Sequence, residues 1–337
     1  MLNIALGFDD KFARHGAVCV ASLLDNSSSD VHFYIMHEQG RLSDLSKANI
    51  ESILPQFGNG HRITWLTIDG DKLRSAFTGH WSSVAVFYPL MLPELCPEER
   101  ILFLDADTMV TSDLTSVYST DLGGNIMAAV HDFPMEAMYF SGEGADRPLK
   151  NGGGLTAREY YYGRLGFTTD ELKRYFNSGV MLMDLAMLRA EDFTAKTTAM
   201  LAEYKFAYVD QDCLNLYCRG RVMLLPAQYN FMILEEYRRG DFSPEFWAEI
   251  EPYITAREKP AIIHLILKPD LFLYKETPLF HDLYWGYIKH TPYKKYARKT
   301  SYWSWANISK WMRRLGSKEG RRKLKTTLRG VILNKSK

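Results

Sequence analysis

The sequence predicts an α/β fold with a mostly parallel, mixed sheet flanked by helices. In the first half of the chain, short apolar runs alternate with amphipathic segments of helical character. The apolar runs are too uniformly hydrophobic for strands that face water on one side, and such runs are typical of parallel strands covered by helices on both faces. The length of 337 residues allows one large domain or two ordinary ones.

The predicted elements follow one another along the chain. In the first half, we expect strands at residues 3–8, 31–37, 62–68 and 100–106, and helices between them at residues 15–26, 43–54 and 81–92. After residue 113, we expect strands at 125–131, 179–185 and 261–266, and helices at 186–205 and 210–218. The stretch 141–155 is rich in glycine and charge, which indicates a lid, a binding loop or a disordered segment.

The net charge of +1 conceals a strong asymmetry. Residues 289–337 contain 16 lysines and arginines but only one acidic residue, Glu319, whereas residues 1–288 contain 25 basic and 39 acidic residues. The four cysteines show no CxxC spacing, which favours free thiols over a zinc site. No apolar run has the length of a membrane span, and the first residues are predicted to be a strand rather than a signal peptide.

Asp105 and Asp107 follow the apolar run RILFL, separated only by Ala106. If the strand continues through them, both carboxylates point to the same side, because side chains alternate faces with a period of two. Two carboxylates so close together repel each other, and a divalent cation removes that cost; Mn²⁺ and Mg²⁺ favour such oxygen ligands. A solvated strand end or a helix cap would explain the same pattern.

Further polar residues lie at the ends of other buried elements. His264 ends a late apolar run and precedes Lys268 by four residues; imidazole is a ligand for Mn²⁺, and lysine neutralises phosphate. A buried core histidine is the alternative. Asn177, Ser178 and Gly179 open the run GVMLMDL, and the triplet Asp210, Gln211 and Asp212 begins a predicted helix. The triplet offers three side chains to sugar hydroxyls, although Asp210 would also serve as a helix cap.

Taken in order, these motifs resemble those of glycosyltransferase family 8, which includes bacterial lipopolysaccharide galactosyl- and glucosyltransferases and the glycogenins. The resemblance covers roughly residues 1–285. It rests on six segments: IALGFDDKF, FYPLMLPEL, ILFLDAD, YFNSGVMLMDL, VDQDCLN and HLILKP. Several ordered motifs are far more specific than any one of them.

The resemblance implies a Rossmann-like, nucleotide-sugar-binding glycosyltransferase A-type fold. It also implies a retaining hexosyltransferase with Mn²⁺ as cofactor and Mg²⁺ as the alternative ion. We expect UDP-glucose or UDP-galactose as donor and a glycan or lipid-linked saccharide, such as a lipopolysaccharide core, as acceptor. The alternatives from other classes are a catalytically silent module that binds sugar nucleotides or glycans, and a metal-dependent phosphohydrolase.

The resemblance also implies roles for individual residues. The metal ligands would be Asp105, Asp107 and His264, and Lys268 would contact the diphosphate. The nucleotide would be held by Gly7, Asp9 and Phe12, with Asp9 reading the uracil and Phe12 stacking on it. The residues around the donor sugar and the reactive centre would be Asn177, Asp210 and Gln211.

The chain departs from the family pattern at two places. Tyr88-Pro89-Leu90 stands where the family usually has an arginine for the donor. The segment from His264 to Lys268 is two residues shorter than usual and lacks a glycine, and Asp270 replaces a tryptophan after Pro269. These departures motivate the silent-module alternative, and Lys11 stands where the family often has asparagine.

We predict a catalytic domain at residues 1–285 and a basic, aromatic tail at 286–337. Within the tail, Ile308, Trp311, Met312 and Leu315 have helical spacing among many basic residues, and Trp303 and Trp305 precede them. Such a pattern is typical of helices in a membrane interface that face anionic lipid. A solvated basic helix, a disordered tail or nucleic-acid binding are alternatives, but we expect no nucleic acid. The tail therefore predicts a cytoplasmic enzyme that is peripheral on the inner face of the bacterial plasma membrane.

Overall fold

The computed structural model describes residues 1–76, 84–140, 142–149, 151–232, 251, 253, 255–266 and 278–295. The chain divides into two compact units, of which the first, Met1–Leu271, contains both sheets. The described part of the second unit contains one helix, α12 (Pro278–Ile288). The predicted division after residue 285 stays a prediction.

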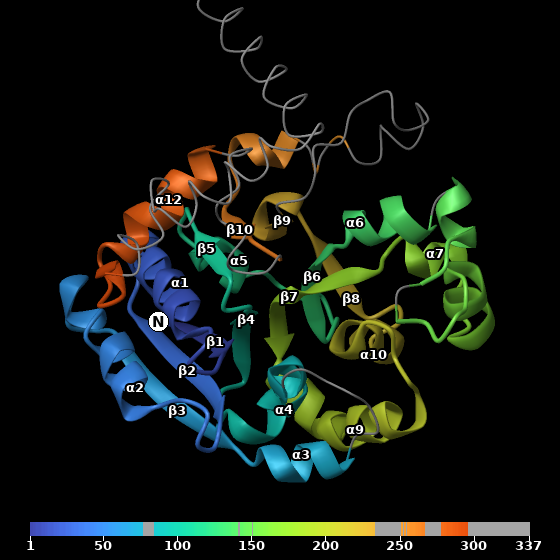
Figure 1. Ribbon diagram of the computed structural model, residues 1–337, viewed down its shortest axis with the longest axis horizontal. Coiled ribbons are helices and arrows are strands. Elements are labelled where there is room, and N and C mark those ends of the chain that lie inside the picture. Colours follow the sequence, from blue (N-terminus) through green and yellow to red (C-terminus); the bar gives the residue numbers. More distant parts are fainter. Residues whose placement is uncertain are drawn as a thin grey trace, which may run out of the picture. The chain divides into compact units, whose positions relative to one another are not determined.

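The first unit is built on a seven-stranded sheet with the order β3-β2-β1-β4-β7-β6-β8 (Figure 1). The strands are β1 (Leu2–Gly7), β2 (Val31–Glu38), β3 (Arg62–Ile68), β4 (Arg100–Leu104), β6 (Met127–His131), β7 (Phe176–Asp184) and β8 (Val222–Leu225). Strand β7 is antiparallel to both of its neighbours, and the other neighbouring pairs are parallel. The carboxyl ends of β1, β4 and β6 therefore lie at the same edge of the sheet as the first residues of β7.

A smaller sheet continues from the end of β4. It consists of β5 (Thr108–Val110), β10 (Ile262–His264) and β9 (Phe231–Met232), with β10 in the middle. Strand β10 is antiparallel to β5 and parallel to β9. This pairing brings the late segment of the chain beside the residues that follow β4.

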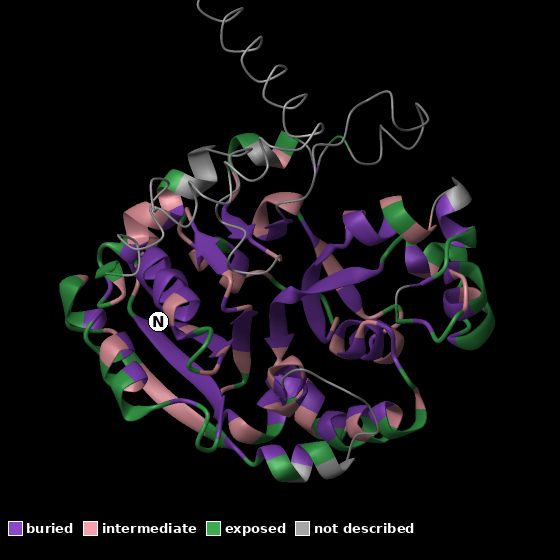
Figure 2. Ribbon diagram, in the orientation of Figure 1, coloured by how far each residue is buried: buried purple, intermediate pink, exposed green. Residues whose placement is uncertain are grey.

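Helices cover both faces of the larger sheet. Ala5, Phe103 and Met181 belong to a core that includes buried side chains of α4, α8, α9 and α10, while α1, whose residues are almost all buried, lies over the other face (Figures 1 and 2). The α-helices in the described part of this unit are α1 (Ala13–Asn26), α2 (Asp44–Glu51), α3 (Gly70–Ala76), α4 (Tyr88–Leu95), α5 (Thr115–Tyr118), α6 (Phe133–Met135), α7 (Thr169–Leu172), α8 (Leu185–Ala190), α9 (Phe193–Glu203) and α10 (Val209–Tyr217).

The predicted fold class and the predicted strands are confirmed, with shifts at the strand ends. Three details were wrong. The expectation that every strand is buried on both faces fails for β3, which is the edge strand of the sheet and is only partly covered. The helix predicted at 186–205 is two helices, α8 and α9, because Asp192 between them has a φ of 54°. The described part of the helix predicted at 81–92 begins as a 3₁₀ turn, and α4 starts only at Tyr88.

Candidate active site

Asp105 and Asp107 lie in the turn that joins β4 to β5. The prediction that they continue an extended strand was wrong, because β4 ends at Leu104 and β5 begins at Thr108. The Thr108 N–H and hydroxyl both donate to the Asp105 carbonyl, at 3.1 and 2.8 Å, and close the turn. The Asp105 N–H donates to the carbonyl of Gly179 on β7 at 2.8 Å, which ties the turn to the larger sheet.

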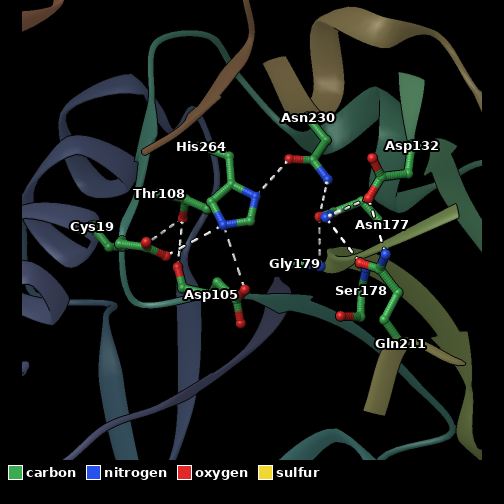
Figure 3. Close-up of polar contacts among 11 residues, drawn as sticks. Cys19, Asp105, Thr108, Asp132, Asn177, Ser178, Gly179, Gln211, Asn230 and His264 are labelled. Atoms are coloured by element: carbon green, nitrogen blue, oxygen red, sulfur yellow. Dashed lines mark hydrogen bonds and ion pairs between the residues drawn. The ribbon is translucent and has the colours of Figure 1, made fainter. Parts of the chain in front are cut away.

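His264 meets the two carboxylates through strand pairing. It is the last residue of β10 and lies opposite Thr108 of β5. Its Nε2 lies 3.4 Å from Asp105 Oδ2 and 3.3 Å from Asp107 Oδ1 (Figure 3). One ligand atom from each of the three residues falls within 4.8 Å of the others. The structure thus brings together the three residues predicted as metal ligands, which we call the metal triad.

Gly179 makes room for the metal triad. A Cβ atom at this position would lie 2.2 Å from Cε1 of His264 and 2.8 Å from Oδ2 of Asp105. Both distances are far shorter than a van der Waals contact, so the imidazole and the carboxylate can meet only over a backbone without a side chain.

The charges in the metal triad suit a bound cation. Burial lowers the pKa of His264, but the carboxylates of Asp107 and Asp105 outweigh it and raise the pKa to about 10. Burial raises the pKa of Asp107, but the charge and hydrogen bond of His264 outweigh it and lower the pKa overall. A divalent cation would take the place of the proton between these groups. Two carboxylates and an imidazole fit Mn²⁺, and the Asp105 side chain is 42% exposed, which leaves the site open to a ligand.

A buried polar network connects the metal triad to Asn177 and Gln211 (Figure 3). His264 Nδ1 lies 3.0 Å from Asn230 Oδ1, and Asn230 Nδ2 donates to Asn177 Oδ1 at 2.8 Å. Asn177 Nδ2 donates in turn to Gln211 Oε1 at 3.0 Å. Partners of this kind fix the orientation of a metal-binding histidine, so Asn230, which was not predicted, supports the metal triad.

Asp132 is a second residue that the sequence prediction missed. Its Oδ2 accepts from Asn177 Nδ2 at 3.2 Å and from Gln211 Nε2 at 3.0 Å, and its Oδ1 accepts from the Met135 N–H. It is buried, and burial outweighs these hydrogen bonds and raises its pKa. The signal was present, because Asp132 directly follows a buried strand, as Asp105 does.

Asn177 and Gln211 are held rigidly by this network. Asn177 uses all four of its hydrogen-bonding positions, since its Oδ1 also accepts from the Gly179 N–H and its Nδ2 also donates to Asp132. Gln211 Oε1 accepts from Asn177 and from the Ser178 N–H, while its Nε2 donates to Asp132. The amide of Gln211 therefore cannot flip without breaking all three bonds.

The three residues of the DQD triplet have different roles. Burial and then the charge of Asp105 raise the pKa of Asp210 to about 7, which indicates that Asp210 lies near the metal triad. Asp210 is not the cap of α10, because that position is occupied by Tyr208. Asp212 was predicted to offer a side chain to sugar hydroxyls, which was wrong. It is fully buried and accepts hydrogen bonds from Tyr160, Tyr161 and Tyr175.

The residues predicted to bind the nucleotide lie at the carboxyl end of β1 and just beyond it, at the same edge of the sheet. A Cβ atom on Gly7 would lie 2.3 Å from the Tyr88 ring, so glycine is required there for packing. Asp9 Oδ1 accepts from the N–H groups of Lys11 and Phe12, at 2.9 and 3.1 Å, and shapes the turn into α1. Phe12 is 37% exposed, as a platform for a base would be. Lys268 lies outside the described residues.

The metal triad depends on the missing side chain at Gly179, and this can be tested. We expect Gly179→Ala to separate His264 from Asp105 and to weaken Mn²⁺ binding, measured by isothermal titration calorimetry, by about 10- to 100-fold. Gly163→Ala is the matched control, because a Cβ atom there meets nothing within 4 Å. Unchanged Mn²⁺ affinity in Gly179→Ala would contradict this account of the site.

Comparison with solved structures supports the fold. The chain is 21% identical to the galactosyltransferase LgtC, solved with donor and acceptor sugar analogues, at a TM-score of 0.65, covering 86% of this chain and 96% of that one. It is also 21% identical to the bifunctional glycosyltransferase WbbM, at a TM-score of 0.72, covering 89% of this chain and 51% of that one. The glycosyltransferase A-type fold is confirmed.

Sequence comparison identifies the family. General stress protein A of Bacillus subtilis (strain 168) is 23% identical over 298 residues, covering 86% of this chain and 94% of that protein. The lipopolysaccharide 1,2-glucosyltransferase of Escherichia coli (strain K12) is 28% identical over 239 residues, and the match spans 68% of this chain and 62% of that enzyme. Residues 3–267 match the model of glycosyl transferase family 8. The chain belongs to that family.

Proposed function

We propose that this protein transfers glucose or galactose from a UDP-sugar to a glycolipid or lipopolysaccharide-type acceptor, with the help of a divalent metal. The observation that carries the proposal is the metal triad of Asp105, Asp107 and His264 in a member of a glycosyltransferase family. The E. coli relative is a lipopolysaccharide glucosyltransferase and LgtC is a galactosyltransferase, and both support a hexose donor and a saccharide acceptor.

The metal triad would hold Mn²⁺, with Mg²⁺ as the alternative, beside the diphosphate of the donor. The bound ion would supply Lewis-acid stabilisation of the negative charge that grows on the leaving diphosphate. Gly7, Asp9 and Phe12 would hold the nucleoside. Asp9 fits this role because its Oδ1 is occupied by backbone N–H groups, which fixes the carboxylate for recognition of a base.

At the sugar end, we assign different roles to Asn177, Gln211 and Asp210. Asn177 positions Gln211, because its own hydrogen-bonding positions are occupied by protein groups. Gln211 is held by three hydrogen bonds, and its amide also interacts with the hydroxyl of Tyr175, so we assign Gln211 a supporting role near the anomeric carbon. Asp210 would bind a sugar hydroxyl, and a carboxyl with a raised pKa is suited to sharing a proton with such a group.

We propose that the transfer retains the anomeric configuration, as is typical of this family. In that mechanism the departing phosphate oxygen takes the proton of the acceptor hydroxyl on the same face of the sugar. Asp132 is the other buried carboxylate of the site, and three N–H groups already bind it. We therefore assign Asp132 a positioning role and not that of a base or nucleophile.

We also propose that the tail at residues 286–337 holds the enzyme on the cytoplasmic face of the bacterial plasma membrane, near a lipid-linked acceptor. The excess of basic residues and the three tryptophans within residues 303–311 support this proposal. Among the described helices, none combines the length and the apolar character that crossing a bilayer requires.

The transfer reaction predicts metal-dependent turnover of a UDP-sugar. We expect the protein to release UDP from UDP-glucose or UDP-galactose when Mn²⁺ and extracted lipid acceptor are present, and chelation to abolish the release. Asp105→Ala and Asp107→Ala should each lower the rate by at least about 100-fold, because each removes a ligand of the ion that would stabilise the charge on the leaving diphosphate. Asp121→Ala, which changes an exposed acid outside the site whose carboxylate accepts from the Gly123 N–H, should leave the rate unchanged.

Different products distinguish the alternatives. Transfer requires that mass spectrometry detect a hexose on the lipid. UDP binding without turnover would favour a silent binding module instead, which Pro89 and the short segment between His264 and Lys268 first suggested. Release of inorganic phosphate would favour a phosphohydrolase, and absence of both UDP binding and turnover would end the proposal.

The tail predicts binding to anionic vesicles. Replacing Arg313, Arg314, Arg321 and Arg322 by glutamine in the full-length protein should lower its partition onto vesicles containing phosphatidylserine by roughly 100-fold or more, since each basic residue contributes about 1 kcal/mol near such a surface. Neutral phosphatidylcholine vesicles are the control and should bind both proteins weakly. Equal flotation of the two proteins with anionic vesicles would contradict the proposal.

A further inference from the structure

Helix α1 packs along strand β5, and polar side chains on one face of α1 contact that strand. We call this row of side chains the polar stripe. Ser22 Oγ accepts from the Val110 N–H at 3.0 Å, and Asn26 Nδ2 donates to the Val110 carbonyl at 3.2 Å. One turn earlier, Cys19 Sγ lies 3.3 Å from Thr108 Oγ1 (Figure 3). Because β5 begins directly after the Asp105–Asp107 turn, these contacts direct the first turn of α1 towards the metal triad.

His15 continues this stripe, four residues before Cys19. It is 1% exposed, and it lies close enough to Asp107 for the two groups to interact electrostatically. Arg14 Nε lies 3.0 Å from His15 Nε2 and donates to it, because the guanidinium carries only N–H donors. The imidazole therefore holds the half-buried Arg14 side chain at the start of α1.

His15 lies near both places where a nucleotide would be held. Its ring centroid lies 5.6 Å from that of the exposed Phe12. It also lies close enough to Asp107 of the metal triad for the two groups to interact electrostatically. A nucleotide with its base on Phe12 and its phosphates at the metal triad would therefore pass close to His15 and to the Arg14 side chain that His15 holds.

The chemistry of arginine suits that location. A guanidinium binds phosphate oxygens through two parallel N–H bonds, and its charge offsets that of a diphosphate beside acidic side chains. We propose that Arg14, oriented by His15, binds the diphosphate of the donor nucleotide. This inference rests on the proposed function. It adds a cation from the chain's own first helix to Lys268, which the family resemblance implied for the diphosphate.

The test compares UDP with uridine, which lacks the phosphates. In the presence of Mn²⁺, we expect Arg14→Gln to weaken UDP binding by about 10- to 100-fold and to leave uridine binding, followed by ligand-observed NMR, unchanged. The UDP affinity of Arg14→Lys should lie between those of the unaltered protein and Arg14→Gln, because lysine keeps the charge but lacks the planar guanidinium. The matched control is Arg158→Gln, which removes an exposed arginine that forms an ion pair with Asp146 at 2.8 Å.

Each other outcome overturns the assignment. If Arg14→Gln binds UDP as tightly as the unaltered protein does, Arg14 does not contact the diphosphate. Equal losses for UDP and uridine would make Arg14 a structural residue only. A loss in Lys11→Gln but not in Arg14→Gln would give the role to Lys11. Failure of the unaltered protein to bind UDP at all would instead overturn the proposed function itself.

Discussion

The close approach of His264 and Asp105 over the bare backbone of Gly179 is the constraint on which the site depends. The turn after β4 is tied to β7 through Gly179, and β5 is paired with β10, so one short segment joins the two sheets. The three residues of the metal triad are therefore brought together when both sheets have formed. A side chain at position 179 would push the imidazole and the carboxylate apart.

Several carboxylates in and around the site are buried at a cost in folding free energy. Burial raises the pKa values of Asp132, Asp210 and Asp212, so each carboxylate is less stable folded than in water when the pH exceeds its ordinary pKa. Hydrogen bonds offset part of this cost for Asp132 and Asp212. The role of Asp212 is structural. Its hydrogen bonds to three tyrosines hold α10 in place, and α10 carries Gln211. Carboxylates kept at such a cost are typical of functional sites.

The sequence predicted the fold class and the residues of the metal triad, but not the way in which the chain brings those residues together. Strand periodicity placed Asp105 and Asp107 on one face, whereas a turn brings them together. Position along a strand could not reveal that β7 runs antiparallel, which puts Asn177 at the same edge as Asp132. Asn230 carried no motif of its own, and Asp132 carried only its place after a buried strand, since the roles of both come from hydrogen bonds between segments far apart in the chain. Asp212 was mistaken for a ligand because sequence does not show its three tyrosine partners.

The central claim is that a divalent ion binds between Asp105, Asp107 and His264. Crystals of the protein soaked with Mn²⁺ and UDP test it most directly, by anomalous diffraction at a wavelength where manganese scatters strongly. The account predicts the strongest anomalous peak among these three side chains, in contact with His264 Nε2 and both carboxylates. A structure with UDP bound and no manganese peak at that position would contradict it.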